Sequence, residues 1–449
     1  MTAIDLTPLT PLTDMIAQTE ATKKYIERHY ENLQIRMTEY NDRRKKLQNS
    51  LSRREIPPKD KQKILSEFQL LEMQNLRLQR YTLKESDFSK IKVIGRGAFG
   101  EIILVRCKLD NQVYVMKKLS KLEMHRKAQL THVRTERDIM ADTSSSCSLL
   151  VKIYFSFQDE DFLYLIMEYL AGGDMMNLLI MKDILPESWT QFYIAQMLLA
   201  LDFLHVHNYL HRDVKPDNCL FTANGDLKMS DFGLAAAGEE FEEYTASEPN
   251  LNTDRASTIQ TFKSRRRLLA KSKVGTADYV APEVLVRTTQ GYGPEADWWS
   301  VGCIMFECLC GYPPFCSDSP QETCNRVIHH KQSFSFPPDC KISAAAKDLI
   351  QQLLKDAPER IGTKGGVRQI LAHPFFEGLN IDKLKNGQLS PPFHPDLSHE
   401  IDTKYFEHFE EVEQAKTPRS PSQKPWEKID AAFLGYTFKR GVEYNCMME

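Results

Sequence analysis

The chain has 449 residues, a formal net charge of -3, 42% apolar residues and 27% charged residues. This length exceeds what one hydrophobic core usually supports and predicts two or three structural units. The nearly balanced charge argues against a dedicated nucleic-acid-binding protein. The ten cysteines are scattered without a C-x-x-C pair, so neither a zinc site nor a disulfide framework is indicated.

Several features predict an intracellular protein without a transmembrane segment. Residues 1–14 lack the basic and apolar regions of a signal peptide. The most apolar window, residues 298–312, contains Glu307 and is too short to cross a bilayer, so we expect a buried helix there. Cysteines without a disulfide framework suit a reducing compartment, and we expect the protein in the cytoplasm, the nucleus or both.

Residues 1–87 form the first unit and are predicted to be helical. Apolar residues recur there as on one face of a helix: Ile26, Tyr30, Leu33, Met37, Tyr40 and Leu47. A second helix is expected over residues 64–81. Pro57 and Pro58 separate the two helices, because proline is not tolerated inside a helix. The first helix also carries four consecutive basic residues, 43–46.

Residues 88–376 form the second unit, in which the pattern changes from strands to helices. Strands are expected over residues 88–94, 101–106, 112–119 and 162–169, and helices over residues such as 190–205 and 344–354. The fold class is therefore α+β, with a small β-rich lobe before a larger helical lobe. Residues 377–449 form a third unit, a proline-containing tail that ends in aromatic residues.

A series of short motifs runs through the second unit. In chain order these are Gly95-Arg-Gly-Ala-Phe-Gly100, Lys117, Glu136, His211-Arg-Asp213, Asn218, Asp231-Phe-Gly233 and Ala281-Pro-Glu283. The glycine motif lies between two predicted strands, which separates it from dinucleotide-binding turns that open a helix. On its own it fits a plain hairpin turn equally well. In this order and spacing, the motifs resemble those of eukaryotic protein kinases, and the resemblance covers most of the chain.

The resemblance implies a bilobal protein kinase fold in which the small lobe binds ATP. Glycines let backbone N–H groups approach the phosphates, Lys117 grips the α- and β-phosphates, and Glu136 pairs with Lys117. The residues expected at the nucleotide are Ile94, Gly95, Arg96, Gly97, Ala98, Phe99, Gly100, Glu101, Ile102, Val115, Lys117, Glu136, Met167, Glu168 and Leu170. Val115 replaces the alanine usual in kinases, and we expect it to tune the adenine pocket rather than to close it.

The catalytic loop is expected at residues 211–218. By resemblance, Asp213 orients the substrate hydroxyl and accepts its proton, and Lys215 neutralises charge on the γ-phosphate. Asn218 and Asp231 would hold the magnesium ion that bridges the β- and γ-oxygens. The implied cofactors are ATP and Mg2+.

Two further features of the helical lobe agree with the resemblance. Glu283 is expected to pair with Arg360, and the segment 297–302 to anchor the catalytic loop from behind. A catalytically silent scaffold that binds nucleotide stays an alternative, because Val115 departs from the usual pattern.

Lys215 lies two residues after Asp213, as in serine/threonine kinases, so protein serine and threonine hydroxyls are the expected substrates. Asp174 and Asp217 fall where related kinases read a basic residue upstream of the target, because arginine forms charge-assisted pairs with carboxylates. Each acid could equally be a solvated surface carboxylate.

The tail narrows the resemblance to the AGC kinases, since Phe433-Leu-Gly-Tyr436-Thr437-Phe438 is similar to their C-terminal hydrophobic motif. In that group the tail wraps over the small lobe and places its aromatics beside the Glu136 helix. An aromatic-rich terminus with another packing role is the alternative. The basic N-terminal helix and the long segment from Asp231 to Glu283 resemble the NDR/LATS branch in particular.

In the NDR/LATS branch the N-terminal helical region binds Mob coactivators. Tyr30, Arg43 and Arg44 are the residues expected at such a partner, because a basic helix face suits an acidic surface. A self-solvated helix, lipid binding and self-association are the alternatives. The basic stretch 262–270 would restrain the kinase or, alternatively, act as a nuclear-localisation signal.

The resemblance also implies control by two phosphorylations. Ser272 matches the activation-segment site, and phosphate there could pair with Arg212 and with His132. Phosphate on Thr437 would lock the tail on the small lobe. Ser272 would be self-phosphorylated and Thr437 modified by an upstream Ste20-like kinase, in a Hippo/NDR-type pathway of morphogenesis, cell division or growth control.

Overall fold

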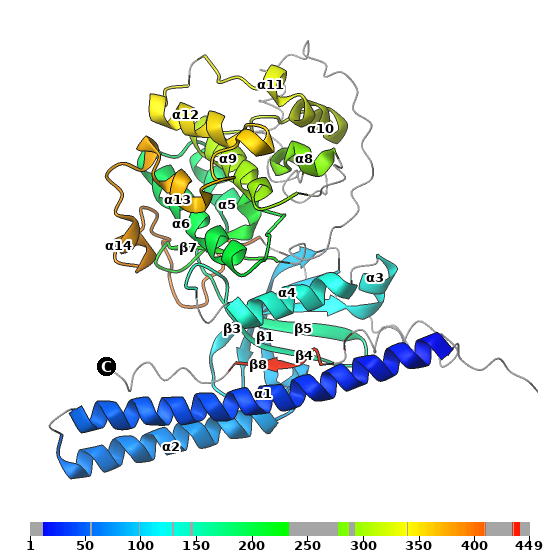
Figure 1. The fold of residues 1–449 in the computed structure, drawn as a ribbon, viewed down its shortest axis with the longest axis vertical. Helices are drawn as coiled ribbons and strands as arrows, with labels where there is room; N and C mark the ends of the chain where they lie inside the picture. Colours follow the sequence, from blue (N-terminus) through cyan, green and yellow to red (C-terminus); the bar gives the residue numbers. More distant parts are fainter. Residues whose placement is uncertain are drawn as a thin grey trace, which may run out of the picture.

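The computed structural model describes residues 12–53, 56–97, 99–127, 130–143, 147–232, 277–286, 292–338, 340–407, 409, 433 and 435–440. Figure 1 shows a β-rich lobe next to a larger helical lobe, with two long N-terminal helices running along the side of the β-rich lobe. This arrangement confirms the α+β, bilobal kinase fold expected from the sequence.

The small lobe is built on one antiparallel sheet with the strand order β1-β2-β3-β5-β4-β8. Its strands are β1 (Phe88–Gly97), β2 (Gly100–Cys107), β3 (Val113–Ser120), β4 (Ile153–Gln158), β5 (Phe162–Glu168) and β8 (Phe438–Lys439). Helices α3 (Lys121–Arg126) and α4 (Leu130–Thr143) belong to the same lobe, and α4 packs against β4. The sequence predicts β1, β2, β3 and β5 but not β4 or β8.

The larger lobe is mostly helical. It contains α5 (Met175–Lys182), α6 (Glu187–Val206), α8 (Pro282–Leu285), α9 (Glu295–Cys310), α10 (Pro320–Ile328), α11 (His330–Ser333), α12 (Ala344–Leu353), α13 (Gly366–Leu371) and α14 (Ile381–Lys385), with the short strands β6 (Cys219–Phe221) and β7 (Leu227–Met229). Every residue of α9 after Glu295 is buried, which confirms the expected buried helix. That helix ends at Cys310 because Gly311 takes the left-handed conformation (φ 84°).

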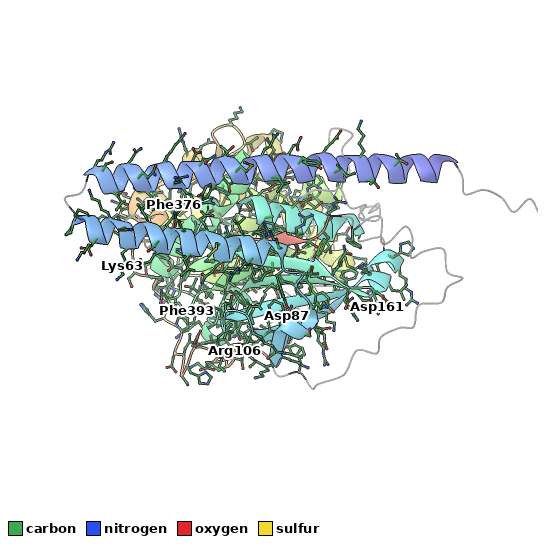
Figure 2. The ribbon with its side chains drawn as sticks, turned by 90° about the horizontal axis from the view of Figure 1, so that it is seen from below. Lys63, Asp87, Arg106, Asp161, Phe376 and Phe393 are labelled. Carbon is green, nitrogen blue, oxygen red and sulfur yellow. The ribbon has the colours of Figure 1, made fainter. Side chains whose placement is uncertain are left out.

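The N-terminal region forms a helical hairpin of α1 (Leu12–Arg53) and α2 (Pro58–Arg80). Pro58 opens α2 at a position where its missing N–H costs nothing. Leu47, Leu51 and Phe68 form the buried contact between the helices. Figures 1 and 2 show α1 extending past the end of α2, so the first part of the predicted apolar face is exposed, as at Tyr30 (64%).

The tail returns to the small lobe and completes its sheet. Phe433 and Tyr436 are fully buried, and Ser156 of β4 donates to the Tyr436 backbone oxygen over 2.6 Å. On α4, next to Glu136, the Arg137 guanidinium lies 5.6 Å from the centre of the Tyr436 ring. The expectation that the tail places its aromatics beside the Glu136 helix is therefore confirmed.

None of the helices in the described part of the chain is long and apolar enough to cross a membrane.

Candidate active site

Lys117 in β3 is the residue around which charged groups of both lobes gather. Its Nζ lies 2.7 Å from Glu136 Oε1 on α4 and 3.4 Å from Asp231 Oδ1. Burial alone would lower the pKa of Lys117, but the charges of Asp231 and Glu136 outweigh burial and raise that pKa above its ordinary value. Lys117 is therefore protonated, and the ion pair with Glu136 that the sequence predicts is present.

The side chains of the catalytic loop converge on Asp213. Lys215 Nζ donates to Asp213 Oδ2 over 2.7 Å. Asn218 Nδ2 donates to the Asp213 backbone oxygen over 2.8 Å and to its Oδ2 over 3.1 Å. Two donors thus fix the same carboxylate oxygen, Oδ2, and with it the orientation of the Asp213 side chain.

Two residues of this region adopt a left-handed backbone that residues other than glycine rarely take, Arg212 (φ 64°) and Asp231 (φ 62°). Asp297 in α9 stabilises the backbone at Arg212. Its carboxylate accepts the backbone N–H groups of His211 over 3.0 Å and of Arg212 over 2.8 Å. Burial would raise the pKa of Asp297, but hydrogen bonding and charge from His205 hold it below its usual range. The structure confirms that the segment beginning at Asp297 anchors the catalytic loop.

Asn218 and Asp231 offer the oxygen ligands that a hard divalent cation prefers. The Asn218 amide nitrogen is committed to Asp213, which turns the amide oxygen to the other side. The charge of Lys117 lowers the pKa of Asp231, so this carboxylate is ionised at neutral pH. No group of three or more His, Cys, Asp or Glu side chains that could hold a metal ion occurs within the described ranges. The Asn218 amide oxygen and the Asp231 carboxylate are two ligands of the kind that a hard divalent cation accepts.

The glycine-rich segment is a tight hairpin between β1 and β2, with Gly97 opposite Gly100. A Cβ on Gly100 would lie 1.8 Å from the Lys118 carbonyl oxygen, so only glycine allows this approach. The Phe99 backbone oxygen accepts from Ser120 N over 2.8 Å, which ties the turn to the end of β3. Ala98 lies outside the described residues.

An apolar cluster beside this hairpin provides the surface expected for adenine. Its buried members are Ile94, Leu104 and Val115, and its half-buried members include Ile102, Met167 and Tyr169. Val115 stands opposite Met167 in the β3–β5 register, so its methyl groups occupy space next to residues 167–170, the hinge that connects the two lobes.

At the hinge, backbone and side chain of Glu168 are both engaged. Its N–H donates to the Lys152 carbonyl over 3.0 Å, and its carboxylate accepts from Lys228 Nζ over 2.8 Å at each oxygen. The Glu168 N–H is thus committed within the fold and is not available to adenine. Leu170, the second expected hinge residue, is buried.

The tail contributes to the nucleotide site in a way that the sequence does not predict. Ile401 and Phe406 join the apolar cluster, and the Phe406 ring lies 5.8 Å from the ring of Tyr169. The Tyr169 hydroxyl donates to the Asp402 backbone oxygen over 2.5 Å. The only signal for this contact in the sequence was the aromatic character of the tail, which does not specify a partner.

The two acids expected to read a basic substrate residue are half-buried, so neither is an ordinary solvated carboxylate. Asp174 is the N-cap of α5, and its carboxylate accepts the backbone N–H of Asn177 over 2.7 Å. Burial raises the pKa of Asp174 to about 7 and that of Asp217 to about 6. The negative charge of Asp217 adds to the shift at Asp174.

A further pair of acids, Asp278 and Glu307, is buried in the larger lobe. Glu307 in α9 is fully buried and accepts from the Tyr279 hydroxyl over 2.6 Å. Burial, followed by the charge of Glu307, raises the pKa of Asp278 to about 8. In the sequence, the only signal for this pair was Glu307 inside the apolar run 298–312. From the sequence alone, Glu307 argued only against a membrane span.

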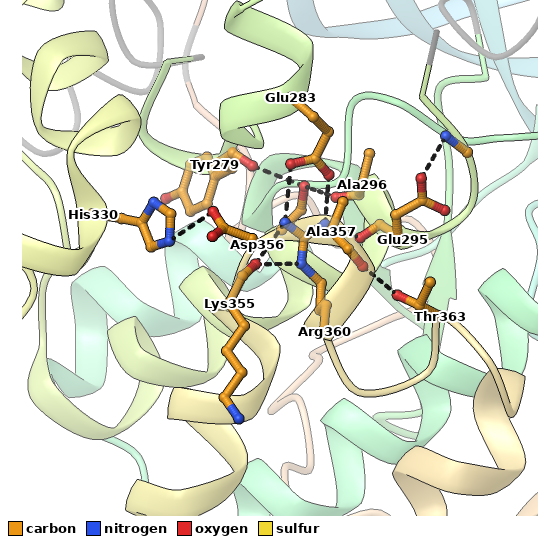
Figure 3. Close-up of polar contacts among 12 residues, drawn as sticks. Tyr279, Glu283, Glu295, Ala296, His330, Lys355, Asp356, Ala357, Arg360 and Thr363 are labelled. Atoms are coloured by element: carbon orange, nitrogen blue, oxygen red, sulfur yellow. Dashed lines mark hydrogen bonds and ion pairs between the residues drawn. The ribbon is translucent and has the colours of Figure 1, made fainter. Parts of the chain in front are cut away.

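Arg360 and Glu283 form the ion pair expected at the end of the activation segment (Figure 3). Two guanidinium nitrogens donate to the two Glu283 carboxylate oxygens over 2.5 and 3.0 Å. The other donations go to the backbone oxygens of Glu295 over 2.6 Å and of Lys355 over 2.9 and 3.1 Å. The guanidinium also covers the Trp299 ring at 5.1 Å, so this one side chain joins α8, α9 and the segment that follows α12.

The residues expected to control activity are described only in part. Ser272 and Gly233 lie outside the described residues, as does the side chain of His132. Arg212 keeps two guanidinium nitrogens, Nε and Nη1, buried without a hydrogen-bond partner in the part of the chain that the structure describes. Thr437 is exposed between the buried Tyr436 and β8.

The three residues expected at an N-terminal partner differ in their surroundings. Tyr30 and Arg44 are exposed on α1. Arg43 Nε instead donates over 3.0 Å to Glu72 Oε1 on α2, where Glu72 is only 6% exposed. Arg43 therefore holds the hairpin together, a role that the sequence did not suggest because the pairing spans two helices.

The protein kinase domain family matches residues 88–376. Serine/threonine-protein kinase CBK1 of Yarrowia lipolytica is 38% identical, over 97% of this chain and 78% of that protein. Probable serine/threonine-protein kinase ndrB of Dictyostelium discoideum is 41% identical, over 93% of this chain and 81% of that protein. Serine/threonine-protein kinase tricornered of Drosophila pseudoobscura pseudoobscura is 40% identical, over 93% of each chain. The chain therefore belongs to the protein kinase family, as a serine/threonine kinase of the NDR/LATS branch of the AGC group.

Proposed function

We propose that this kinase transfers the γ-phosphoryl group of magnesium-bound ATP to serine and threonine hydroxyls in basic protein sequences. One observation carries the proposal: the side chains expected to bind phosphates, metal and hydroxyl meet where the lobes join. Lys117 lies 3.4 Å from Asp231, and Asn218 lies 2.8 Å from the Asp213 backbone oxygen.

The proposed reaction assigns a role to each of these residues. Asp213 orients the substrate hydroxyl and accepts its proton as the new O–P bond forms. Lys215, within 2.7 Å of Asp213, neutralises charge that develops on the transferred group, and Lys117 positions the α- and β-phosphates. Asn218 and Asp231 would hold magnesium, which would supply positive charge to offset that of the phosphates.

The half-buried acids Asp174 and Asp217 support a preference for basic substrates. Asp174 and Asp217 have raised pKa values because each is removed from water without a cation close enough to compensate fully. An arginine of the substrate would supply that cation and form charge-assisted hydrogen bonds with the carboxylates.

The regulatory part of the proposal assigns phosphorylation to Ser272 and Thr437. Phosphate on Ser272 would have partners in the two unsatisfied nitrogens of Arg212, since a buried guanidinium nitrogen without an acceptor is unfavourable. Thr437 is exposed, which suits modification by an upstream Ste20-like kinase, and its neighbour Tyr436 lies against α4.

The N-terminal helices are proposed to bind a Mob-like coactivator in a Hippo/NDR-type pathway, in the cytoplasm, the nucleus or both. Several apolar side chains of α1 are exposed, among them Ile26, Tyr30 and Met37. Arg44 adds positive charge to the exposed surface of the same helix. Arg44→Glu should weaken binding of a Mob protein, whereas Arg43→Glu would also disrupt the hairpin and is less informative.

A peptide-library phosphorylation assay tests the catalytic proposal. The purified chain should phosphorylate serine and threonine peptides that carry upstream arginine, with magnesium present, and a Mob protein should increase the rate. Asp213→Asn should lower the rate by about 10²-fold or more, because general-base catalysis contributes on the order of 10²–10⁴-fold. A preference for acidic peptides, or full activity of Asp213→Asn, would contradict the proposal.

A further inference from the structure

Cys310 and Cys340 bring two thiols into contact at the C-terminal end of α9. Their Sγ atoms lie 3.2 Å apart, although 30 residues separate them along the chain. Cys310 is the last residue of α9 and is buried, whereas Cys340 lies between α11 and α12 and is half-buried. The two sulfur atoms need to approach by only about 1 Å to reach the bond length of a disulfide.

The segment that carries Cys340 is held against α9 by aromatic packing. The Phe306 ring of α9 lies 5.8 Å from the ring of Phe334 and 5.7 Å from that of Phe336. A backbone hydrogen bond from Cys340 N to the Pro337 oxygen, over 3.1 Å, fixes the turn just before the thiol. The fold itself therefore places the two thiols together while both are reduced.

We propose that Cys310 and Cys340 are a redox-sensitive pair that closes into a disulfide when the kinase meets a hydroperoxide. The Cys340 thiolate, the more accessible of the two, attacks the peroxide O–O bond and becomes a sulfenic acid, and the leaving hydroxide takes up a proton. The Cys310 sulfur then attacks the Cys340 sulfur and displaces its hydroxyl group as water. With hydrogen peroxide, the two thiols lose two electrons and two protons, and the peroxide becomes two water molecules.

The disulfide would tie the end of α9 to the segment between α11 and α12. Such a bond restricts the unfolded chain more than the folded one, which already holds the sulfur atoms in contact. We therefore expect oxidation to make the larger lobe more resistant to heat, and reduction to reverse the effect.

Disulfide mapping of the full-length protein tests this proposal. After treatment with a few equivalents of hydrogen peroxide and alkylation without reductant, digestion should yield a peptide that links Cys310 to Cys340. The oxidised protein should melt about 5 °C or more above the reduced protein. Cys340→Ser should abolish both results, as should Cys310→Ala, whereas Cys324→Ser, at another half-buried thiol, should preserve them.

Three results would overturn the proposal. The first is that the oxidised, folded protein gives no linked peptide. The second is that the urea-unfolded chain forms the same link at the same rate, since the contact in the fold would then be irrelevant. The third is a link from either cysteine to a different thiol.

Discussion

At the scale of single residues, Arg360 provides the clearest case of one side chain that stabilises the larger lobe. Arg360→Ala is expected to lower the free energy of unfolding by about 3 kcal/mol, because removal of this fully buried partner leaves the Glu283 carboxylate, only 12% exposed, without compensation. Urea unfolding followed by intrinsic fluorescence measures this loss. Arg360→Lys is the matched variant, and it should recover only part of the loss because an ammonium group cannot reproduce the two-pronged contact. A loss below about 1 kcal/mol for Arg360→Ala would contradict the expectation.

The raised pKa values of Asp174 and Asp217, about 7 and about 6, predict a pH-dependent substrate affinity. Both lie above the usual aspartate range, so these groups become neutral at a pH where an exposed aspartate is still charged. KM for a peptide with upstream arginine should therefore rise as the pH falls from about 8 to about 5.5, since neutral carboxyls lose their attraction for arginine.

A peptide with alanine in place of the arginine is the control for this pH profile, and its KM should change little. The double variant Asp174→Asn, Asp217→Asn should show a high KM for the arginine peptide at every pH. Parallel pH profiles for the two peptides in the wild-type protein would show that these acids do not read the arginine.

At the scale of elements, the tail strand β8 connects the N-terminal helices to the sheet. Lys439 Nζ donates to the backbone oxygens of Leu78 and Gln79 over 2.9 Å each, and also to that of Tyr81. These carbonyls belong to the end of α2, where backbone oxygens lack helical partners and a positive charge is favourable. On the other side, β8 pairs with β4.

Lys439→Ala is expected to destabilise the end of α2. The last carbonyls of α2 lose a charged donor, which lowers the free energy of local opening by about 1 kcal/mol. Hydrogen–deuterium exchange should show faster exchange of the amides of residues 77–81, by about fivefold. Lys63→Ala, at an exposed position of α2, is the matched control and should leave this region unchanged (Figure 2). Unchanged exchange in Lys439→Ala would mean that the tail does not hold α2.

The elements differ in how far the sequence predicts them. Helix α9 and strands β1 to β3 follow from apolar runs and periodicity, and the catalytic motifs follow from residue types that phosphoryl transfer requires. Strand β8 could not be predicted, because two residues show no periodicity and its pairing with β4 depends on the fold. The same holds for Phe406 at the nucleotide site and for the Arg43–Glu72 pair, since both join segments far apart in the sequence.

At the scale of the whole molecule, the tail contacts the hinge, the apolar cluster, α4, the sheet and the end of α2. Its residues 401–406 reach the hinge and the apolar cluster next to the glycine-rich hairpin. Its last described residues pack on α4, extend the sheet and hold the end of α2. A change in the docking of the tail can therefore reach Glu136 and its pair Lys117 through α4, and can reach the N-terminal hairpin through Lys439.

The catalytic rate of the kinase with and without phosphate on Thr437 tests this control most directly. The comparison uses one basic peptide and three proteins: the chain phosphorylated on Thr437, the unphosphorylated chain and Thr437→Ala, each verified by intact mass. The phosphorylated chain should have a kcat at least about tenfold higher than the other two, corresponding to ~1.4 kcal/mol of improved transition-state stabilisation. Asp213→Asn phosphorylated on Thr437 should stay inactive. Equal kcat values for the phosphorylated and unphosphorylated chains would contradict control through the tail.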